Sequence, residues 1–301
     1  MDFPKITLIH PATFKLDGGA MFGIIPKPLW AKKIKPDEFN RILMSLRVVL
    51  IQTKNKNILI DTGIGSYHEE KFNEQFAVNG NKNPLVSILK NDFSLTPDKI
   101  TDIILTHLHF DHVGGLAENL NESTPIFPKA MIHVHKKHFE YAQEPTLRDK
   151  GSFQNHFYEK PLKYYQENNQ VNFIETEEGC ILSEDQLTID FKISFGHTPY
   201  MLHPIINNKF IYMADLVPMS HHINIPWVMG YDIEPGTTTK YKEIFYQYIL
   251  KNDLTLIFEH DLEYWGAKIL QDDRGQYKLK NTYPSTKENS ERIDYHEQKN
   301  S

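Results

Sequence analysis

Hydrophobic and polar residues follow one another along this chain in two kinds of pattern. Short apolar runs bounded by glycine, asparagine or charged residues are typical of buried strands. Such runs predict strands at residues 6–9, 46–53, 57–61, 103–106, 130–134, 171–174, 187–193, 210–215 and 254–261. Longer segments that mix apolar and polar residues predict helices at 84–90, 135–143, 157–167 and 238–251.

The order of these elements indicates the fold class. Strands and helices are interleaved, which favours an α/β protein with its chemistry at the strand ends. We predict one domain over residues 1–280, because a chain with 40% hydrophobic residues can bury a substantial core. Residues 281–301 are polar and lack apolar periodicity, so they are predicted to form a frayed tail. The segment 144–169, rich in aromatic and charged residues, is a candidate helical flap near a site.

Composition narrows the classes of partner. The chain has 33 basic and 39 acidic residues, a formal net charge of −6, and only a short basic run at 31–35. We therefore expect no nucleic-acid partner. No segment approaches the roughly 18 uninterrupted apolar residues of a membrane span, and no signal-peptide pattern follows Met1. These observations favour a cytoplasmic protein without a membrane partner. The single cysteine, Cys180, excludes an internal disulfide and is expected to be a packed thiol.

The run Thr106-His-Leu-His-Phe-Asp-His-Val-Gly-Gly115 carries the densest chemistry of the chain. It places three imidazoles and a carboxylate within six positions. Imidazole nitrogen and carboxylate oxygen are the ligands preferred by zinc and neighbouring first-row metals. On an extended segment His107, His109 and Asp111 would face one side and His112 the other. A turn at the strand end can bring both sets around two adjacent metals, so we predict a metal site.

The pattern HxHxDH followed by Gly-Gly resembles the signature loop of metallo-β-lactamase-fold hydrolases. Three later elements extend the resemblance, which covers roughly residues 5–270. They are Gly196-His197-Thr198-Pro199, the strand that ends at Asp215, and the strand that ends at His260. The resemblance implies a four-layer αββα sandwich with two mixed sheets. One departure is that the family often continues GHTP with Gly-His, where this chain has Tyr200-Met201.

Carried over residue by residue, the resemblance implies a binuclear centre. The first site would consist of His107, His109 and His197, the second of Asp111, His112 and His260, and Asp215 would bridge them. The expected cofactors are two divalent ions, foremost Zn²⁺, although this ligand set also accepts Mn²⁺, Fe²⁺ or Co²⁺. The resemblance also makes Asp61 a carboxylate that orients a ligating imidazole. The alternative for Asp61 is an Asx turn that caps its strand.

The N-terminal segments 14–23 and 26–30 resemble those of N-acyl-homoserine lactonases. The function thus implied is opening of an ester or lactone by a metal-bridging hydroxide. Asp215, together with Asp111, would handle the metals and the proton of the attacking water, and Tyr231 or His222 would donate to the oxyanion. A phosphotriesterase is the first alternative, followed by a glyoxalase-type thioesterase and a non-catalytic metal-binding module.

We expect a small uncharged substrate with an apolar portion. Its pocket is predicted to include the N-terminal segment and the loop after Asp215. The candidate residues are Met21, Phe22, Trp30, Met219, His221 and Trp227, for each of which core packing is the alternative. His133, His135, His138 and His203 are expected to be structural or surface histidines. The oligomeric state stays open, with a homodimer as the candidate.

Overall fold

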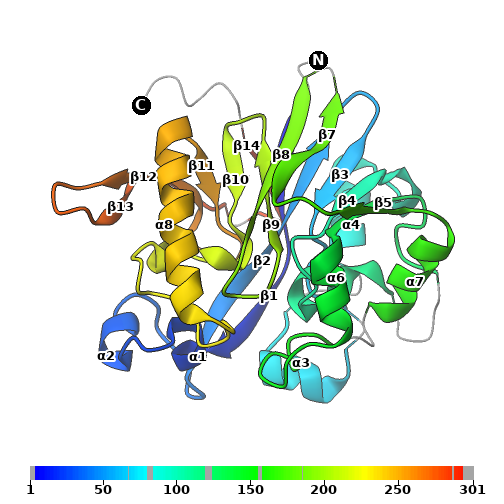
Figure 1. Cartoon of the computed structure of the whole chain (residues 1–301). Helices are drawn as coiled ribbons and strands as arrows, with labels where there is room; N and C mark the ends of the chain where they lie inside the picture. The colour runs from blue at the N-terminus through cyan, green and yellow to red at the C-terminus, as the bar shows by residue number, and fades with distance from the viewer. Residues whose placement is uncertain are drawn as a thin grey trace.

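Two seven-stranded sheets face each other in the computed structural model (Figure 1), which describes residues 4–66, 68–79, 84–118, 124–154, 158–184, 186–286 and 288–293. The first sheet has the order β14 (Ser290–Ile293), β1 (Lys5–Asp17), β2 (Arg41–Gln52), β3 (Asn57–Ile60), β4 (Asp102–Ile104), β5 (Met131–His135) and β6 (Val171–Ile174). The second has the order β13 (Tyr277–Pro284), β12 (Tyr264–Gln271), β11 (Thr255–Ile257), β10 (Phe210–Tyr212), β9 (Met201–Ile206), β8 (Leu187–Ser194) and β7 (Glu178–Glu184).

Both sheets mix parallel and antiparallel pairs. The strands β3, β4, β5 and β6 are parallel neighbours in the first sheet, and β10 and β11 are parallel in the second. The longer helices are α4 (Pro84–Phe93), α6 (Lys136–Gln143), α7 (Glu159–Glu167) and α8 (Pro235–Asn252). The shorter helices are α1 (Gly18–Phe22), α2 (Lys27–Trp30), α3 (Glu70–Phe76) and α5 (Phe110–Val113).

The alternation of side chains along the strands produces the layers. On β2, Val48 and Leu50 join a core with residues of α4, α6 and α7, whereas Val49 and Ile51 face a second core. That second core also contains residues of the opposite sheet and of α8. Because successive strand residues point to opposite faces, an apolar residue at every position makes a strand buried on both sides. The predicted αββα sandwich is confirmed.

The prediction from sequence found at least part of β1 to β6 in the first sheet and of β8, β10 and β11 in the second, and it missed other strands of the second sheet. The strands β7, β9 and β12 were not predicted, and neither were the short helices α1, α2 and α3. The frayed tail is a correction. Residues 281–284 complete β13, and residues 290–293 form β14, which pairs with β1. These residues join the sheets at their edges, where a strand is held by backbone hydrogen bonds to its one neighbour. Such a strand can be polar, so its sequence need not carry an apolar pattern. The end of the predicted tail lies outside the described residues.

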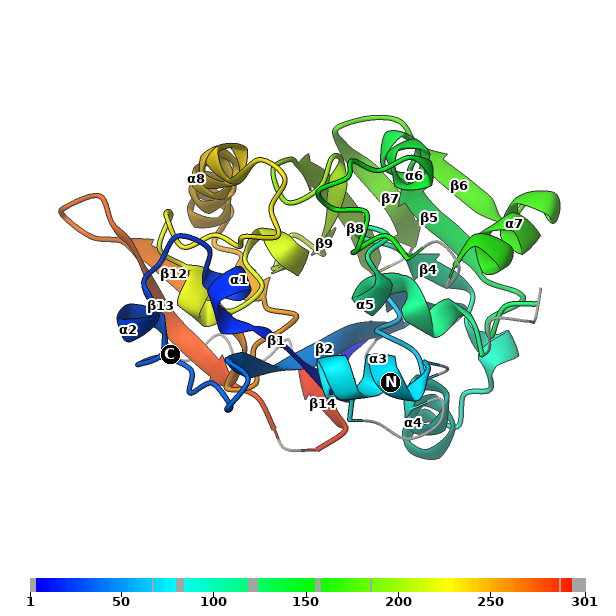
Figure 2. The same cartoon turned by 90° about the horizontal axis from the view of Figure 1, so that it is seen from below.

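The loops that carry the candidate ligands meet at one end of the sandwich. His107 follows β4, Asp215 follows β10 and His260 follows β11, while His197 lies between β8 and β9. In the view from below, α5 lies near the middle of the molecule, with α1 and α8 on one side of it and α6 and α7 on the other (Figure 2). Among the described helices none has the length and apolar character needed to cross a bilayer.

Candidate metal centre

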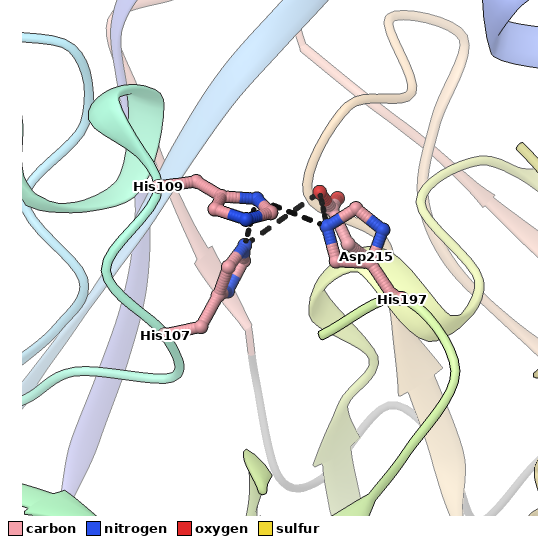
Figure 3. A group of neighbouring side chains, drawn as sticks. All are labelled: His107, His109, His197 and Asp215. Atoms are coloured by element: carbon pink, nitrogen blue, oxygen red, sulfur yellow. Dashed lines mark hydrogen bonds and ion pairs between the residues drawn. The ribbon is translucent and has the colours of Figure 1, made fainter. Parts of the chain in front are cut away.

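Four side chains, those of His107, His109, His197 and Asp215, point toward one another (Figure 3). The Nδ1 atom of His109 lies 3.1 Å from Nε2 of His107 and 3.1 Å from Nε2 of His197. The Oδ2 atom of Asp215 lies 3.0 Å from Nε2 of His197 and 3.7 Å from Nε2 of His107. Ligands placed tetrahedrally at about 2.05 Å from a zinc ion are about 3.3 Å apart. These four distances, of 3.0 to 3.7 Å, lie near the spacing expected between the ligands of one metal ion.

A second group shares Asp215 with the first. Its Oδ1 atom lies 3.1 Å from Nε2 of His260, and its Oδ2 atom lies 3.6 Å from Nε2 of His112. Asp111 is next to both imidazoles, with Oδ2 3.8 Å from Nε2 of His112 and 3.7 Å from Nε2 of His260. His112, Asp215, His260 and Glu259 form a group that could hold an ion. Among the described residues, Nε2 of His112 and Oδ1 of Asp215 are buried without a hydrogen-bond partner.

The structure thus brings together all seven residues selected from the sequence. Each has an exposed fraction of 6% or less. Burying carboxylate charge and nitrogen lone pairs without a partner is costly. A cluster of this kind therefore needs a cation or protons to balance its negative charge. The donor set of imidazole and carboxylate fits divalent ions.

Two glycines explain how the loop with four of these residues reaches its place. A Cβ atom on Gly114 would lie 2.3 Å from the Ile64 carbonyl oxygen, and one on Gly115 would lie 2.1 Å from that of Thr62. The main chain after α5 therefore packs directly on the segment after β3. The Thr62 N–H donates to the His112 carbonyl over 2.8 Å, which fixes this approach.

Four of the five metal-facing imidazoles have a polar partner at their other nitrogen, whereas Nε2 of His109 has none among the described residues. Nδ1 of His197 lies 2.9 Å from Asp232 Oδ1, and Nδ1 of His260 lies 2.8 Å from the Ser45 carbonyl oxygen. Nδ1 of His112 lies 3.1 Å from Asp61 Oδ2. Such partners set the tautomer and leave the lone pair of the other nitrogen for a metal.

Asp61 has a second task in the same loop. Its Oδ1 accepts from the Thr106 N–H over 2.8 Å, and its Oδ2 accepts from the Thr106 hydroxyl over 2.7 Å. The Thr106 hydroxyl oxygen lies 3.0 Å from Nδ1 of His107. These contacts support the orienting role over a turn that only caps β3.

Two carboxylates of the centre were not selected from the sequence. Asp232 holds His197, and Glu259 places Oε2 3.1 Å from Nδ1 of His112, beside Asp61. Glu259 precedes His260 directly, and this adjacency was an available signal. Asp232 is 35 residues from the imidazole that it contacts, and no local pattern marks it.

The electrostatics of the centre couple its imidazoles to Asp215. Burial lowers the pKa of His107 and of His109 well below the usual value. Burial also opposes the charged form of His197 and His260, but the charge of Asp215 outweighs it and raises the pKa of His197 to about 10 and that of His260 to about 9. Without a metal, these two imidazoles are therefore protonated at neutral pH.

Metal binding at pH 7 is consequently expected to release protons from His197 and His260. A metal needs the neutral imidazoles, so the metal-free protein binds more protons than the loaded protein. Raising the pH must then strengthen metal binding, up to about pH 10, where His197 also loses its proton without a metal. Calorimetry in two buffers of different ionisation enthalpy measures the proton release. Binding that releases no proton, with the same affinity at pH 7 and pH 9, would contradict this electrostatic account.

The two predicted oxyanion donors differ in their surroundings. His222 is fully buried, its Nε2 lies 2.8 Å from the Met21 carbonyl oxygen and its ring stacks on Phe22 at 4.8 Å. The Nε2–H donates to that carbonyl, so the prediction of His222 as an oxyanion donor is corrected to a structural role. Tyr231 is half-buried, and burial raises its pKa to about 12, so the phenol keeps its proton at neutral pH.

The predicted pocket residues divide into core and surface. Met21, Phe22, Trp30 and Met219 are buried in the core on the outer side of the first sheet, which corrects their assignment to a pocket wall. Trp30 packs where a Cβ atom on Gly18 would lie, 2.4 Å from its ring, so α1 and α2 enclose these side chains. His221 and Trp227 are half-buried.

A buried lysine shapes the loop after Asp215. Lys242 of α8 is fully buried and donates to the carbonyls of His222, Asn224 and Trp227 over 2.6, 2.7 and 3.0 Å. Because one ammonium group satisfies carbonyls along the loop, it holds the backbone in a single path.

Part of the predicted flap reaches the centre. Phe153 packs edge-on against His109 with the ring centroids 4.5 Å apart. Arg148 donates to the carbonyls of Gly230 and Asp232 over 2.6 and 3.2 Å. The segment from 144 to 154 therefore contacts the loop that carries His109 and the loop that follows Asp215. Residues 155–157 lie outside the described residues.

The other histidines that the structure describes, and the cysteine, lie outside the two metal groups. His133 lies 3.0 Å from Asp102 Oδ1, and His203 lies 2.7 Å from the Ser194 hydroxyl oxygen. Both are buried, as expected of structural histidines. Cys180 is exposed on β7, so the prediction of a packed thiol is wrong.

Comparison with known families places this fold and this cluster of side chains together. Residues 47–260 match the metallo-beta-lactamase superfamily. The match covers more than half of the chain, which therefore belongs to this superfamily of metal-dependent hydrolases. The resemblance seen in the sequence is confirmed. Comparison with curated protein sequences gives no match.

Solved structures resemble the chain over nearly all of its length. A probable metal-dependent hydrolase from Staphylococcus aureus is 28% identical, with a TM-score of 0.78 over 93% of this chain and 99% of that one. AidC, a dizinc quorum-quenching lactonase, is 20% identical, with a TM-score of 0.71 over 93% and 94%. The hydrolase AbOPH is 20% identical, with a TM-score of 0.70 over 94% of each chain. The last two show a shared fold.

Proposed function

We propose that this protein is a binuclear metal-dependent hydrolase that opens an ester or a lactone. The observation that carries the proposal is the sharing of Asp215 between two groups of imidazoles, with Oδ2 3.0 Å from Nε2 of His197 and Oδ1 3.1 Å from Nε2 of His260. A carboxylate in this position can bridge two ions, which in binuclear hydrolases are about 3.5–4 Å apart. Zinc is the ion that we expect first, because both groups offer imidazole nitrogen and carboxylate oxygen donors within 4.8 Å of one another.

Bound metals would supply Lewis acidity at the substrate carbonyl and a water molecule of lowered pKa. The residues of the chain have complementary tasks. Asp61 and Asp232 orient their imidazoles, and Asp111 adds a carboxylate beside His112 and His260. Asp215 is positioned to accept the proton of the attacking water, because both of its oxygens lie inside the cluster.

The surroundings of His109 favour a substrate with an apolar portion. Phe153 packs against His109, while Phe72 and Phe76 of α3 pack against Phe110 with ring centroids 5.6 and 5.2 Å apart. Phe153 also lines a hollow of about 620 Å³. The other residues that line this hollow are Gln143, Glu144, Pro145, Leu147, Lys150 and Gln154, so the apolar character lies in the aromatic side chains beside His109 and not in the hollow as a whole. The name of AidC as a lactonase supports a lactone as the first substrate class to test.

Replacing Tyr231 with phenylalanine tests the proposed oxyanion donor. We expect turnover of a lactone to fall by roughly 10²-fold, the usual effect of losing one donor to a developing oxyanion. The metal content should not change, because Tyr231 belongs to neither metal group. Steady-state kinetics and elemental analysis measure the two quantities. Tyr248→Phe on α8 is the matched control, and an unchanged rate in Tyr231→Phe would remove the phenol from the mechanism.

The proposed function is tested on metal-loaded protein with three substrates: an N-acyl-homoserine lactone, an aryl phosphotriester and a thioester. We expect the lactone to have the largest kcat/KM and chelation to abolish its hydrolysis. A phosphotriester preference would replace the lactonase proposal with the first alternative. Metal binding without turnover of any ester would leave only a binding module. Full activity after rigorous chelation would refute the metal-dependent mechanism.

A further inference from the structure

We infer that His138 is a positioning residue that joins the two ligand loops of the first metal group. This inference rests on the proposed metal-dependent function. His138 lies in the first turn of α6 and is fully buried. Its ring stands between the loop after β4 and the loop between β8 and β9.

The two contacts of the ring assign its protons. The Leu108 N–H lies 2.8 Å from Nε2 of His138 and can only donate, so Nε2 carries the lone pair. The Pro199 carbonyl oxygen lies 2.7 Å from Nδ1 and can only accept, so Nδ1 carries the proton. One neutral tautomer satisfies both contacts, and no other protonation state of the ring does so.

The positions of the two partners give the contacts their consequence. Leu108 lies between His107 and His109, and Pro199 lies two residues after His197. One imidazole therefore bonds to the backbone beside every imidazole of the first group. A shift of either loop would change the spacing of about 3 Å on which that group depends.

The departure from the family pattern at Tyr200 gives an independent reason why the loop between β8 and β9 needs to be held by His138. Tyr200 has a φ of +57°, in the left-handed region where a glycine is unstrained and a tyrosine is not. Its ring stacks on His135 at 4.7 Å and packs against Phe195 at 4.6 Å. His135 ends β5 just before α6, so β5 and α6 hold the strained loop at both Pro199 and Tyr200.

The first test is spectroscopic and uses the wild-type, zinc-loaded protein. Proton–nitrogen correlation spectra of histidine side chains report which ring nitrogen is protonated, and His138→Gln identifies the His138 signals. We expect the Nδ1–H tautomer. An Nε2–H tautomer would overturn the proposed contacts whatever the variants do.

The second test compares metal affinity in full-length variants, by competition with a chromogenic chelator. His138→Leu removes the acceptor and the donor, whereas His138→Gln offers an amide oxygen and an amide N–H in their place. We expect His138→Leu to weaken one bound zinc by roughly 10–100-fold, the usual effect of losing an outer-shell partner, and His138→Gln to recover most of that loss.

His203→Leu is the matched control. His203 is also fully buried, and its ring contacts the Ser194 hydroxyl and the Tyr212 carbonyl, each three residues before a candidate ligand rather than beside one. We expect it to lower thermal stability while its zinc affinity stays within a few-fold of the wild type. Equal zinc affinity in His138→Leu and the wild type would overturn the inference. A loss of zinc affinity in His203→Leu as large as that in His138→Leu would also overturn it. Wild-type protein that binds no zinc would instead refute the proposed function.

Discussion

Asp215→Asn is expected to lower kcat/KM for a lactone by at least roughly 10³-fold, because stabilisation by metal ions is worth several kcal/mol in the transition state. The substitution keeps the shape of the side chain and removes the charge that both groups share. The amide nitrogen would also face Nε2 of an imidazole whose lone pair a metal requires. Steady-state kinetics gives the rate, and elemental analysis should show the loss of at least one metal ion per chain.

Asp253→Asn provides the control for this loss of charge. Asp253 follows α8 with a φ of +49°, a conformation that asparagine tolerates, and its side chain is 81% exposed. We expect unchanged kinetics and metal content. Near-normal activity in Asp215→Asn would show that the shared carboxylate is not part of the catalytic centre.

Arg47→Leu is expected to lower the free energy of unfolding by roughly 3–5 kcal/mol, because several buried acceptors lose their donor at a cost of about 1–3 kcal/mol each. The guanidinium of Arg47 is fully buried on β2 and donates to the carbonyls of Phe258 and Asp261 and to the hydroxyl of Ser285. Those carbonyls flank His260, so the variant leaves the backbone around a candidate ligand without its donors. Denaturant unfolding measures the loss.

Arg41→Leu is the matched control for this prediction. Arg41 also donates to two backbone carbonyls, those of Glu74 and Gln75, but its side chain is partly exposed. Water can replace its contacts, so we expect a loss of about 1 kcal/mol or less. Equal effects of the two variants would show that burial of Arg47 contributes little to stability.

The seven clustered side chains illustrate how far a local pattern reaches. Three imidazoles and a carboxylate in one loop indicate a metal because few other arrangements need so many donors in six positions. The partners of those donors carry no such pattern. Asp232 contacts His197 and Glu259 contacts His112 only because loops far apart in the sequence meet at one end of the sandwich.

The N-terminal aromatic residues illustrate the opposite outcome. Phe22 and Trp30 were predicted to line a pocket, and they are buried against each other with ring centroids 5.5 Å apart. The sequence marks an aromatic residue as apolar without saying whether it faces core or ligand, since both environments are apolar. The path of the neighbouring loop, which Lys242 holds, decides between them.

The sequence by itself determined the layers of this protein and the chemistry of its centre. Apolar residues on both faces of a strand require two covering layers, and metal donors are recognisable by residue type wherever they fold. Only the tertiary structure decided which nitrogen of each imidazole faces inward, which carboxylates stand behind them, and that residues 290–293 pair with β1. Those features are contacts between segments up to some 280 residues apart, and such a contact produces no periodic pattern in the sequence.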